Sequence, residues 1–128
     1  MNILLVDNDI NTVETLKAAL NAKENYKIDI AYGGKQALKK MKGDKLYDVL
    51  ILDIMMPEIN GMDICQLMVK DKKLKKIPVL LISALPISSK AFQDSLGKFD
   101  ELGIIKDVLE KPFSVEDLLV KVRTIVGG

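Results

Sequence analysis

The sequence has no histidine and a single cysteine, and these two shortages exclude several kinds of site. Cys65 has no partner with which to form an internal disulfide, and a chain without histidine cannot assemble a zinc site from cysteine and histidine ligands. We therefore expect Cys65 to be a small apolar residue on a helix.

Long apolar runs and an excess of charge of one sign are also missing. No run approaches the roughly 18 residues that span a membrane, and residues 1–9, MNILLVDND, lack the charged region and cleavage site of a signal peptide. Nineteen basic and eighteen acidic residues leave a formal net charge of +1, so no overall field favours nucleic acid or an anionic membrane. We expect a cytoplasmic protein that binds neither of them directly.

What is present suits one folded domain. The 128 residues are 48% hydrophobic and 29% charged, which is enough apolar material for a core and enough charge for a hydrated surface. A chain of this length buries about two-thirds of its unfolded surface. Because no repeat or linker is visible, we expect residues 1–128 to form a single domain with no effector domain attached.

Short apolar runs predict five strands. Residues 3–6, 49–54 and 79–83 are continuously apolar, which is typical of strands buried on both faces of a parallel sheet. Residues 27–32 alternate between apolar and polar and suit a position nearer an edge. Residues 107–110 predict a fifth strand.

Apolar residues at helical spacing fill the intervals between the strands. Apolar stripes within residues 13–20, 92–99 and 115–126 each predict a helix, and shorter helices fit residues 34–42 and 62–72. The helix within residues 115–126 is the clearest, with Ser114 as its expected N-cap. Alternation of strand and helix predicts an α/β domain of three layers, doubly wound around a five-stranded parallel sheet.

Polar residues follow four of the predicted strands. Asp7, Asn8 and Asp9 follow the first strand, and Asp53, Ser83 and Lys111 end the third, fourth and fifth. Ligands of parallel α/β sheets bind at the carboxyl ends of the strands, so we expect these side chains to surround one crevice.

The residue types in this crevice point to phosphoryl chemistry. Crowded carboxylates repel one another unless a cation is present, and an oxygen-lined site suits Mg²⁺. An aspartate beside the ion can take a phosphoryl group as an acyl phosphate, and Ser83 and Lys111 would donate hydrogen bonds to its oxygens. Plainer roles are also open: Asp7 or Asp9 as a helix cap, Ser83 as a turn residue and Lys111 as a surface lysine.

Five stretches of the sequence resemble the receiver domain of two-component response regulators. They are ILLVDND, AYGGKQAL, DVLILDIMMPEINGMD, VLLISA and EKPF, in this order over nearly the whole chain. The resemblance implies the flavodoxin-like strand order 2-1-3-4-5 and a cis bond before Pro112. It also implies that Asp53 is phosphorylated, with Pro57 in the turn that follows and Gly61 leading into the next helix.

The resemblance further implies a set of ligands and partners. Mg²⁺ would be held by Asp7, Asp53 and the backbone carbonyl of Met55, while Ser83 and Lys111 bind the phosphoryl group. A sensor histidine kinase or a phosphotransfer protein would supply that group, and the domain would signal by contact with an output protein. It would not be an enzyme beyond promoting its own phosphorylation and dephosphorylation.

Four departures from the family pattern bear on this expectation. One is that the segment from Leu85 to Gly103 is longer than usual, which predicts a changed fourth helix. Asn8 stands where receivers usually carry a second acidic metal ligand; the amide oxygen brings no charge, so we expect Mg²⁺ affinity to fall about ten- to a hundredfold. Val108 stands where an aromatic residue is usual, which predicts a different or smaller rearrangement on phosphorylation. Met55 and Leu85 are apolar where some receivers orient the attacking water, which predicts a long-lived phosphoryl state.

Two other functions remain open at this point. A receiver-shaped interaction domain that works without phosphorylation would explain Asn8 and Val108. A phosphatase of the haloacid-dehalogenase type would use Asp7 as nucleophile and Asp9 as acid, although Asp53 would then have no clear role.

Overall fold

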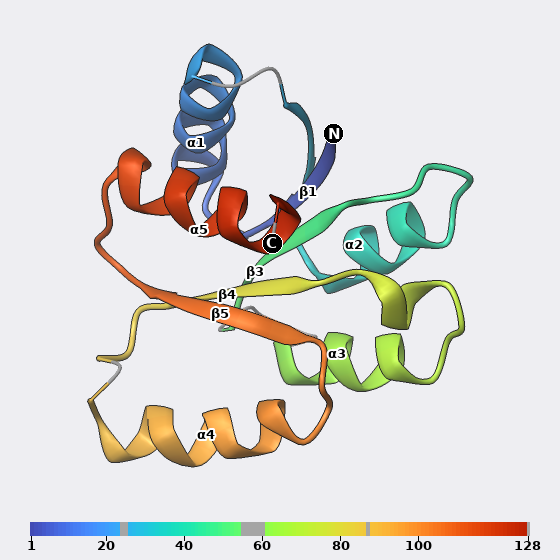
Figure 1. Cartoon of the computed structure of the whole chain (residues 1–128), viewed down its shortest axis with the longest axis vertical. Helices are drawn as coiled ribbons and strands as arrows, with labels where there is room; N and C mark the ends of the chain where they lie inside the picture. Colours follow the sequence, from blue (N-terminus) through green and yellow to red (C-terminus); the bar gives the residue numbers. More distant parts are fainter. Residues whose placement is uncertain (24–25, 55–60, 87, 128) are drawn as a thin grey trace.

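The five strands form a single parallel sheet in the order β2-β1-β3-β4-β5 (Figure 1). The computed structural model describes residues 1–23, 26–54, 61–86 and 88–127. The strands are β1 (Asn2–Val6), β2 (Lys27–Ala31), β3 (Val49–Asp53), β4 (Val79–Ser83) and β5 (Ile105–Glu110). The predicted α/β class and strand order are confirmed.

Helices cover both faces of the sheet. They are α1 (Ile10–Lys23), α2 (Gly34–Met41), α3 (Gly61–Val69), α4 (Lys90–Asp100) and α5 (Val115–Gly127), with one short 3₁₀ turn, η1 (Leu74–Lys76). Figure 1 shows α1 and α5 on one side of the sheet and α3 and α4 on the other. In the described part of the chain, no helix is long and apolar enough to cross a bilayer.

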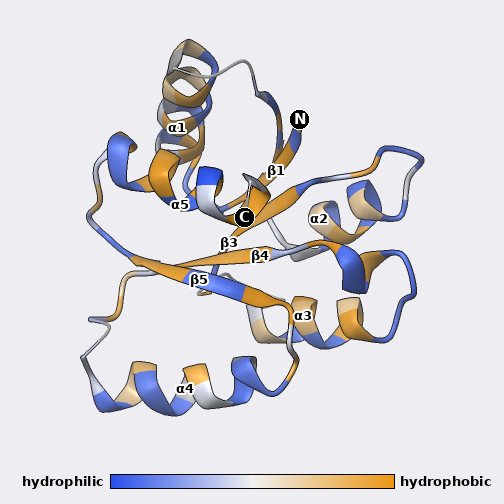
Figure 2. Cartoon of the chain, viewed as in Figure 1, coloured by the Kyte–Doolittle hydropathy of each residue, from blue (hydrophilic) through white to orange (hydrophobic). Residues whose placement is uncertain are grey.

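Alternate residues of each central strand enter two separate cores. In β1, Ile3 and Leu5 pack with the apolar residues of α1 and α5, whereas Leu4 and Val6 pack with those of α2 and α3. The hydropathy colouring in Figure 2 shows the central strands as largely apolar. Burial on both faces explains why β1, β3 and β4 are continuous apolar runs in the sequence.

Two of the elements predicted with bounds differ from them by two residues or more, and the others by one residue at most. Helix α3 ends at Val69 rather than residue 72, because the Asp71 carboxylate accepts the backbone N–H groups of Lys73 and Leu74 (2.8 and 3.1 Å) and turns the chain into η1. Strand β5 begins at Ile105, two residues earlier than predicted, and a register irregularity lies opposite Val79 and Leu80. Such an irregularity breaks the alternation that strand prediction relies on.

Three local predictions are confirmed. The Lys111–Pro112 peptide bond is cis. Ser114 caps α5, since its Oγ accepts the N–H of Asp117 at 3.1 Å. Cys65 lies on α3 and is fully buried, and burial raises the pKa of its thiol to about 12, so it behaves as a small apolar residue.

Candidate functional site

The carboxyl ends of β1, β3 and β4 carry the three buried polar side chains of the described chain. Asp7, Asp53 and Ser83 expose only 1%, 5% and 1% of their surface. Burying a carboxylate is costly unless it is paired and hydrogen-bonded. Two buried aspartates at neighbouring strand ends therefore make this edge of the sheet the candidate site.

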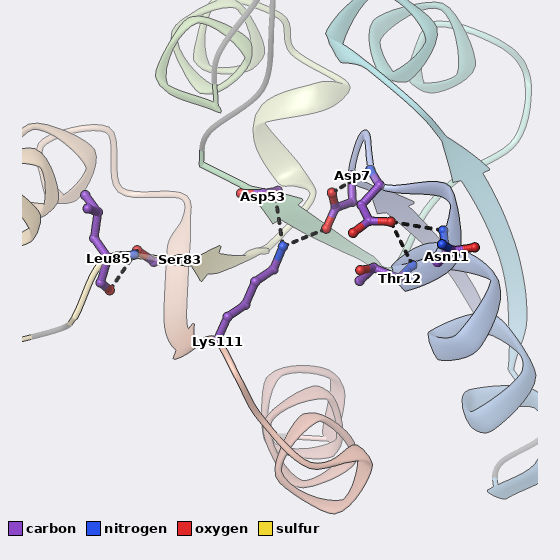
Figure 3. A network of polar contacts seen from close by, with 8 residues as sticks. Asp7, Asn11, Thr12, Asp53, Ser83, Leu85 and Lys111 are labelled. Atoms are coloured by element: carbon purple, nitrogen blue, oxygen red, sulfur yellow. Dashed lines mark hydrogen bonds and ion pairs between the residues drawn. The ribbon is translucent and has the colours of Figure 1, made fainter.

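Lys111 connects the two buried carboxylates. Its Nζ donates to Oδ2 of Asp7 at 2.9 Å and to Oδ2 of Asp53 at 3.1 Å, and Figure 3 shows the side chain reaching from the end of β5 to a point between them. The two oxygens share one partner, so they lie no more than about 6 Å apart. One ammonium thus meets two negative charges through charge-assisted hydrogen bonds.

The environment of Lys111 favours its charged form. Burial alone would lower the pKa of the ammonium, but the hydrogen bonds to Asp7 and Asp53 outweigh it, and the pKa lies above its ordinary value. The side chain is about a quarter exposed, at 27%, so it also faces the solvent from which a ligand would arrive.

The start of α1 fixes Asp7 through Asp9. The backbone N–H of Asp9 donates to Oδ1 of Asp7 at 3.0 Å, and Oδ1 of Asp9 accepts the N–H groups of Asn11 and Thr12 at 3.0 and 3.3 Å. The bond from Thr12 is the main reason that the pKa of Asp9 is lowered. Asp9 is therefore the N-cap of α1, one of the roles the sequence left open.

Ser83 contributes its backbone to the site, while its hydroxyl is engaged elsewhere. The Ser83 carbonyl accepts the N–H of Lys111 at 2.7 Å, which places the lysine at the strand end. The Ser83 hydroxyl donates to the Leu85 carbonyl (3.1 Å) and accepts the Leu85 N–H (3.0 Å). In Figure 3 this pair lies apart from the contact between Lys111 and the aspartates.

Of the two remaining predicted Mg²⁺ ligands, Asn8 lies among the described residues and Met55 does not. Asn8 lies next to Asp7 in the loop before α1 and is exposed. Met55 and Pro57 lie outside the described residues, so the predicted carbonyl ligand and turn stay predictions.

Gly61 has a role that the sequence did not reveal. A Cβ on this residue would lie 3.0 Å from Cα of Ile54 and 3.3 Å from the carbonyl oxygen of Asp53. The N–H of Gly61 also donates to the Ile54 carbonyl at 2.9 Å. The start of α3 thus packs directly on the backbone that carries Asp53. The motif NGMD marked a glycine in a turn, but only the backbone distances show what it touches.

The donor set fits a hard divalent cation. Among the described residues no cluster of three or more Asp, Glu, His or Cys side chains could hold a metal. Mg²⁺ does not need such a cluster, since it is usually bound by one or two carboxylates and keeps several waters. Asp7 and Asp53 supply two buried carboxylates that already converge on one cation, the Lys111 ammonium.

A family model and full-length relatives match this chain. The model of the response regulator receiver domain covers residues 3–123. Response regulator ArlR of Staphylococcus aureus (strain Mu50 / ATCC 700699) is 34% identical over 125 residues, which are 97% of this chain and 52% of ArlR. ArlR of Staphylococcus haemolyticus is 32% identical over 98% of this chain and 52% of its own length. The chain spans about half the length of the curated relatives it matches.

Solved structures share the fold. A two-component response regulator from Clostridium difficile superposes with a TM-score of 0.82 at 27% identity, covering 99% of this chain and 96% of that one. The receiver domain of sensor histidine kinase PA1611 from Pseudomonas aeruginosa superposes with a TM-score of 0.82 at 21% identity, covering 99% and 98%. That structure is described with a magnesium ion coordinated in its active site cleft.

Proposed function

The chain belongs to the response regulator receiver domain family, and on this premise we propose that Asp53 is the residue through which it receives a phosphoryl group. One observation carries the proposal: the Lys111 ammonium contacts both buried carboxylates, Asp7 and Asp53, at 2.9 and 3.1 Å. This arrangement sets a nucleophile, a second carboxylate and a cation at one strand edge.

The proposed step is a direct transfer to Asp53. A carboxylate oxygen of Asp53 attacks the phosphorus, a new O–P bond forms, and the bond from phosphorus to the donor's leaving atom breaks with its electron pair. Lys111, already bonded to Asp53, would offset the charge of the new phosphoryl oxygens. The Ser83 hydroxyl would have to leave its bonds with Leu85 before it could donate to them.

Receiver domains typically bind Mg²⁺, and we propose which residues hold it here. Asp7 and Asp53 would be the carboxylate ligands, joined by the Met55 carbonyl, by water and by the Asn8 amide oxygen. The bound ion would offset the charge of the carboxylates and the incoming phosphoryl group. Because Asn8 is uncharged, we propose weaker binding than with an aspartate at this position.

Response regulator receivers are signalling modules, and the finer assignments are proposals. We propose that a sensor histidine kinase or phosphotransfer protein supplies the phosphoryl group, that an output protein reads the change, and that this happens in the cytoplasm. We also propose that residues 1–128 act as one receiver unit whose only catalysis is on its own Asp53.

The two alternatives fare differently against the geometry. The phosphatase alternative needs Asp9 as an acid, but the Asp9 carboxylate caps α1. A domain that works without phosphorylation is favoured by two observations: Asn8 is uncharged where receivers usually carry an acidic ligand, and the Ser83 hydroxyl is already hydrogen-bonded to Leu85. One experiment distinguishes this alternative from phosphorylation at Asp53.

The experiment is incubation with acetyl phosphate and Mg²⁺, followed by intact mass measurement. We expect one phosphoryl group on the parent chain, none on Asp53→Asn, and the parent level on Asp100→Asn, an exposed aspartate at the end of α4. Asn8→Asp should lower the Mg²⁺ concentration needed for half-maximal modification by about ten- to a hundredfold.

Other results would redirect the assignment. Equal modification of parent and Asp53→Asn would show that the acceptor is another residue. Modification of Asn8→Asp alone would show an intact site that has lost its ion. Failure of both the parent and Asn8→Asp would favour the domain that works without phosphorylation.

A further inference from the structure

The amino end of the sheet gathers nearly half of the chain's basic residues. Residues 39–48 and 70–76, which we call the lysine end, contain nine lysines against three aspartates. The rest of the chain contains ten basic and fifteen acidic residues. A net charge of +1 therefore hides two regions of opposite sign. The nine are Lys39, Lys40, Lys42, Lys45, Lys70, Lys72, Lys73, Lys75 and Lys76.

The fold joins the two segments into one surface. Residues 42–48 link α2 to the start of β3, residues 70–76 link α3 to the start of β4, and parallel strands begin at the same edge of a sheet. Lys73 Nζ donates to the Gly43 carbonyl, so the segments touch. Figure 1 shows both on the same side of the molecule, and Figure 2 colours most of both segments hydrophilic.

Most of these ammonium groups make no direct ion pair with a carboxylate among the described residues, although Lys40 lies near Asp29 and Lys42 near Asp71. Lys45 pairs with Asp29 at 2.8 Å, and Lys73 bonds to a carbonyl. Within the described part of the chain, the other seven lysines have no carboxylate in ion-pair contact, and all seven are exposed. The Asp71 carboxylate accepts backbone N–H groups, and that of Asp48 accepts the N–H of Asn2 at 2.8 Å.

Two hollows on this surface are bordered by lysines. One, of about 560 Å³, lies among Lys72, Lys73 and Lys76, with Tyr47 and Ile77 in its wall. The other, of about 430 Å³, lies beside Lys39 and Lys40. Lysine is a compact, strongly hydrated point charge that binds phosphate without fixing its orientation.

We propose that the lysine end binds the sugar-phosphate backbone of duplex nucleic acid without preference for base sequence. Several exposed lysines on one face provide the charge that sequence-independent binding uses, since each phosphate contact releases a condensed counter-ion. The proposal departs from the expectation that net charge excludes nucleic acid, because the local excess of charge, and not the total, sets the field at a surface.

Other partners fit this surface less well. Single-stranded binding uses exposed aromatic rings, and the only aromatic residue of the lysine end, Tyr47, is 7% exposed. Protein interfaces are enriched in aromatic residues and arginine, and the lysine end has no arginine. A bilayer would need an apolar anchor, and among the described residues of the lysine end Leu46 is the only large apolar side chain that is exposed.

Bound this way, the duplex would not cover the phosphorylation site. Strand β3 runs from Val49 beside the lysine end to Asp53 in the site, a length of about 13 Å. The opposite end of the sheet carries Asp7, Asp9 and Asp53, whose negative charges repel the phosphates of a duplex. The charge distribution therefore orients the domain with Asp53 facing away from the nucleic acid.

The test is fluorescence anisotropy of a short labelled DNA duplex titrated with the full chain at several salt concentrations. We expect a dissociation constant in the micromolar range at about 50 mM salt, equal affinity for duplexes of unrelated sequence, and a log–log salt slope of about −4 to −6. The quadruple variant K42Q/K72Q/K75Q/K76Q should bind at least about tenfold more weakly, with a slope reduced by about 3 to 4.

A matched variant removes the same charge elsewhere. K17Q/K90Q/K98Q/K106Q alters four lysines of α1, α4 and β5 and should stay within about threefold of the parent affinity. Asp53→Asn should also bind as the parent does, so this proposal and that of phosphorylation can fail separately.

Several outcomes would overturn the proposal. The simplest is that the parent chain does not bind the duplex at low salt. An equal loss of affinity in both quadruple variants would show that net charge alone determines the binding. Tighter binding to polyglutamate, to single strands or to phosphatidylserine vesicles than to the duplex would assign the lysine end to that other partner.

Discussion

The two ends of the sheet differ in how their charged side chains are arranged. At the carboxyl end a few charges are buried and paired, with Lys111 held between Asp7 and Asp53. At the amino end many charges of one sign are exposed, and most of them make no direct ion pair within the described part of the chain. The first arrangement fixes positions to within a hydrogen bond, and the second creates a field without fixing any position.

The difference should appear in how each end responds to substitution and to salt. Charges that are close and partly desolvated interact strongly and are screened little, whereas exposed charges interact weakly and are screened within about 10 Å at moderate salt. Substitutions at the carboxyl end should therefore cost stability at any ionic strength. Those at the lysine end should have small effects that salt removes.

The largest effect is expected from Lys111→Met. Methionine keeps much of the apolar stem but leaves two buried carboxylates facing each other, and removing one partner of a buried pair is strongly destabilising. We expect a loss of about 3 kcal/mol in the free energy of unfolding at neutral pH, measured by urea denaturation.

Lys121→Met is the matched control for that substitution. Lys121 pairs with Asp107 at the same distance, 2.9 Å, but the two side chains are 30% and 40% exposed, so we expect a loss below about 1 kcal/mol. The raised pKa of Lys111 means that its pair is fully formed at pH values below the ordinary lysine value of 10.5 and is lost only as pH rises through the higher folded value. Equal losses from both substitutions would contradict the contrast between buried and exposed pairs.

A smaller effect is expected from Gly61→Ala. The new Cβ would lie 3.0 Å from a backbone atom of Ile54, so the chain carrying Asp53 must shift, at about 1–3 kcal/mol. Gly97→Ala on α4 has open space around it and should stabilise by about 0.5–1 kcal/mol through helix propensity. Phosphorylation of Asp53 by acetyl phosphate should slow in the first variant only. An unchanged rate in Gly61→Ala would show that Gly61 does not position the site.

The features that could be predicted from the sequence are those set by local pattern. Buried parallel strands must be apolar on both faces, so β1, β3 and β4 were readable as runs, and polar residues at their ends had to converge. The strand order and the cis bond before Pro112 came from the family resemblance. Neither follows from residue spacing.

The features that could not be predicted depend on distances between residues far apart in the chain. Nothing in the order of residues shows that Lys111 would share its ammonium between Asp7 and Asp53, or that Gly61 would touch the Asp53 backbone. The sequence left open whether the Ser83 hydroxyl binds phosphoryl oxygens or the backbone of its own turn. In the structure it is hydrogen-bonded to the backbone of Leu85. The two basic segments of the lysine end can be seen in the sequence, but neither the sequence order nor the net charge of +1 shows that they form one surface.

The cap of α1 gives a pH-dependent test at the border of the site. Asp9→Ala should lower the melting temperature by a few degrees near pH 7, because two backbone N–H groups lose their acceptor. The pKa of Asp9 is lowered in the folded state, so its contribution is present above the unfolded value of 3.8 and is lost as pH falls through the folded value. Asp9→Asn keeps a capping oxygen and should lack this pH dependence. A gap between parent and Asp9→Ala that persists in strong acid would contradict the cap.

The smallest effect is expected at the lysine end itself. Crowding like charges costs free energy in the folded state, so K42Q/K72Q/K75Q/K76Q should raise the free energy of unfolding by about 0.5–1 kcal/mol at low salt. In about 1 M salt, where the Debye length is about 3 Å, the gain should vanish. K17Q/K90Q/K98Q/K106Q removes lysines that are not crowded together and should show no comparable gain. A gain that survives high salt would mean that the substitutions act through packing or helix propensity, and the two ends of the sheet would then differ less in their electrostatics than their burial suggests.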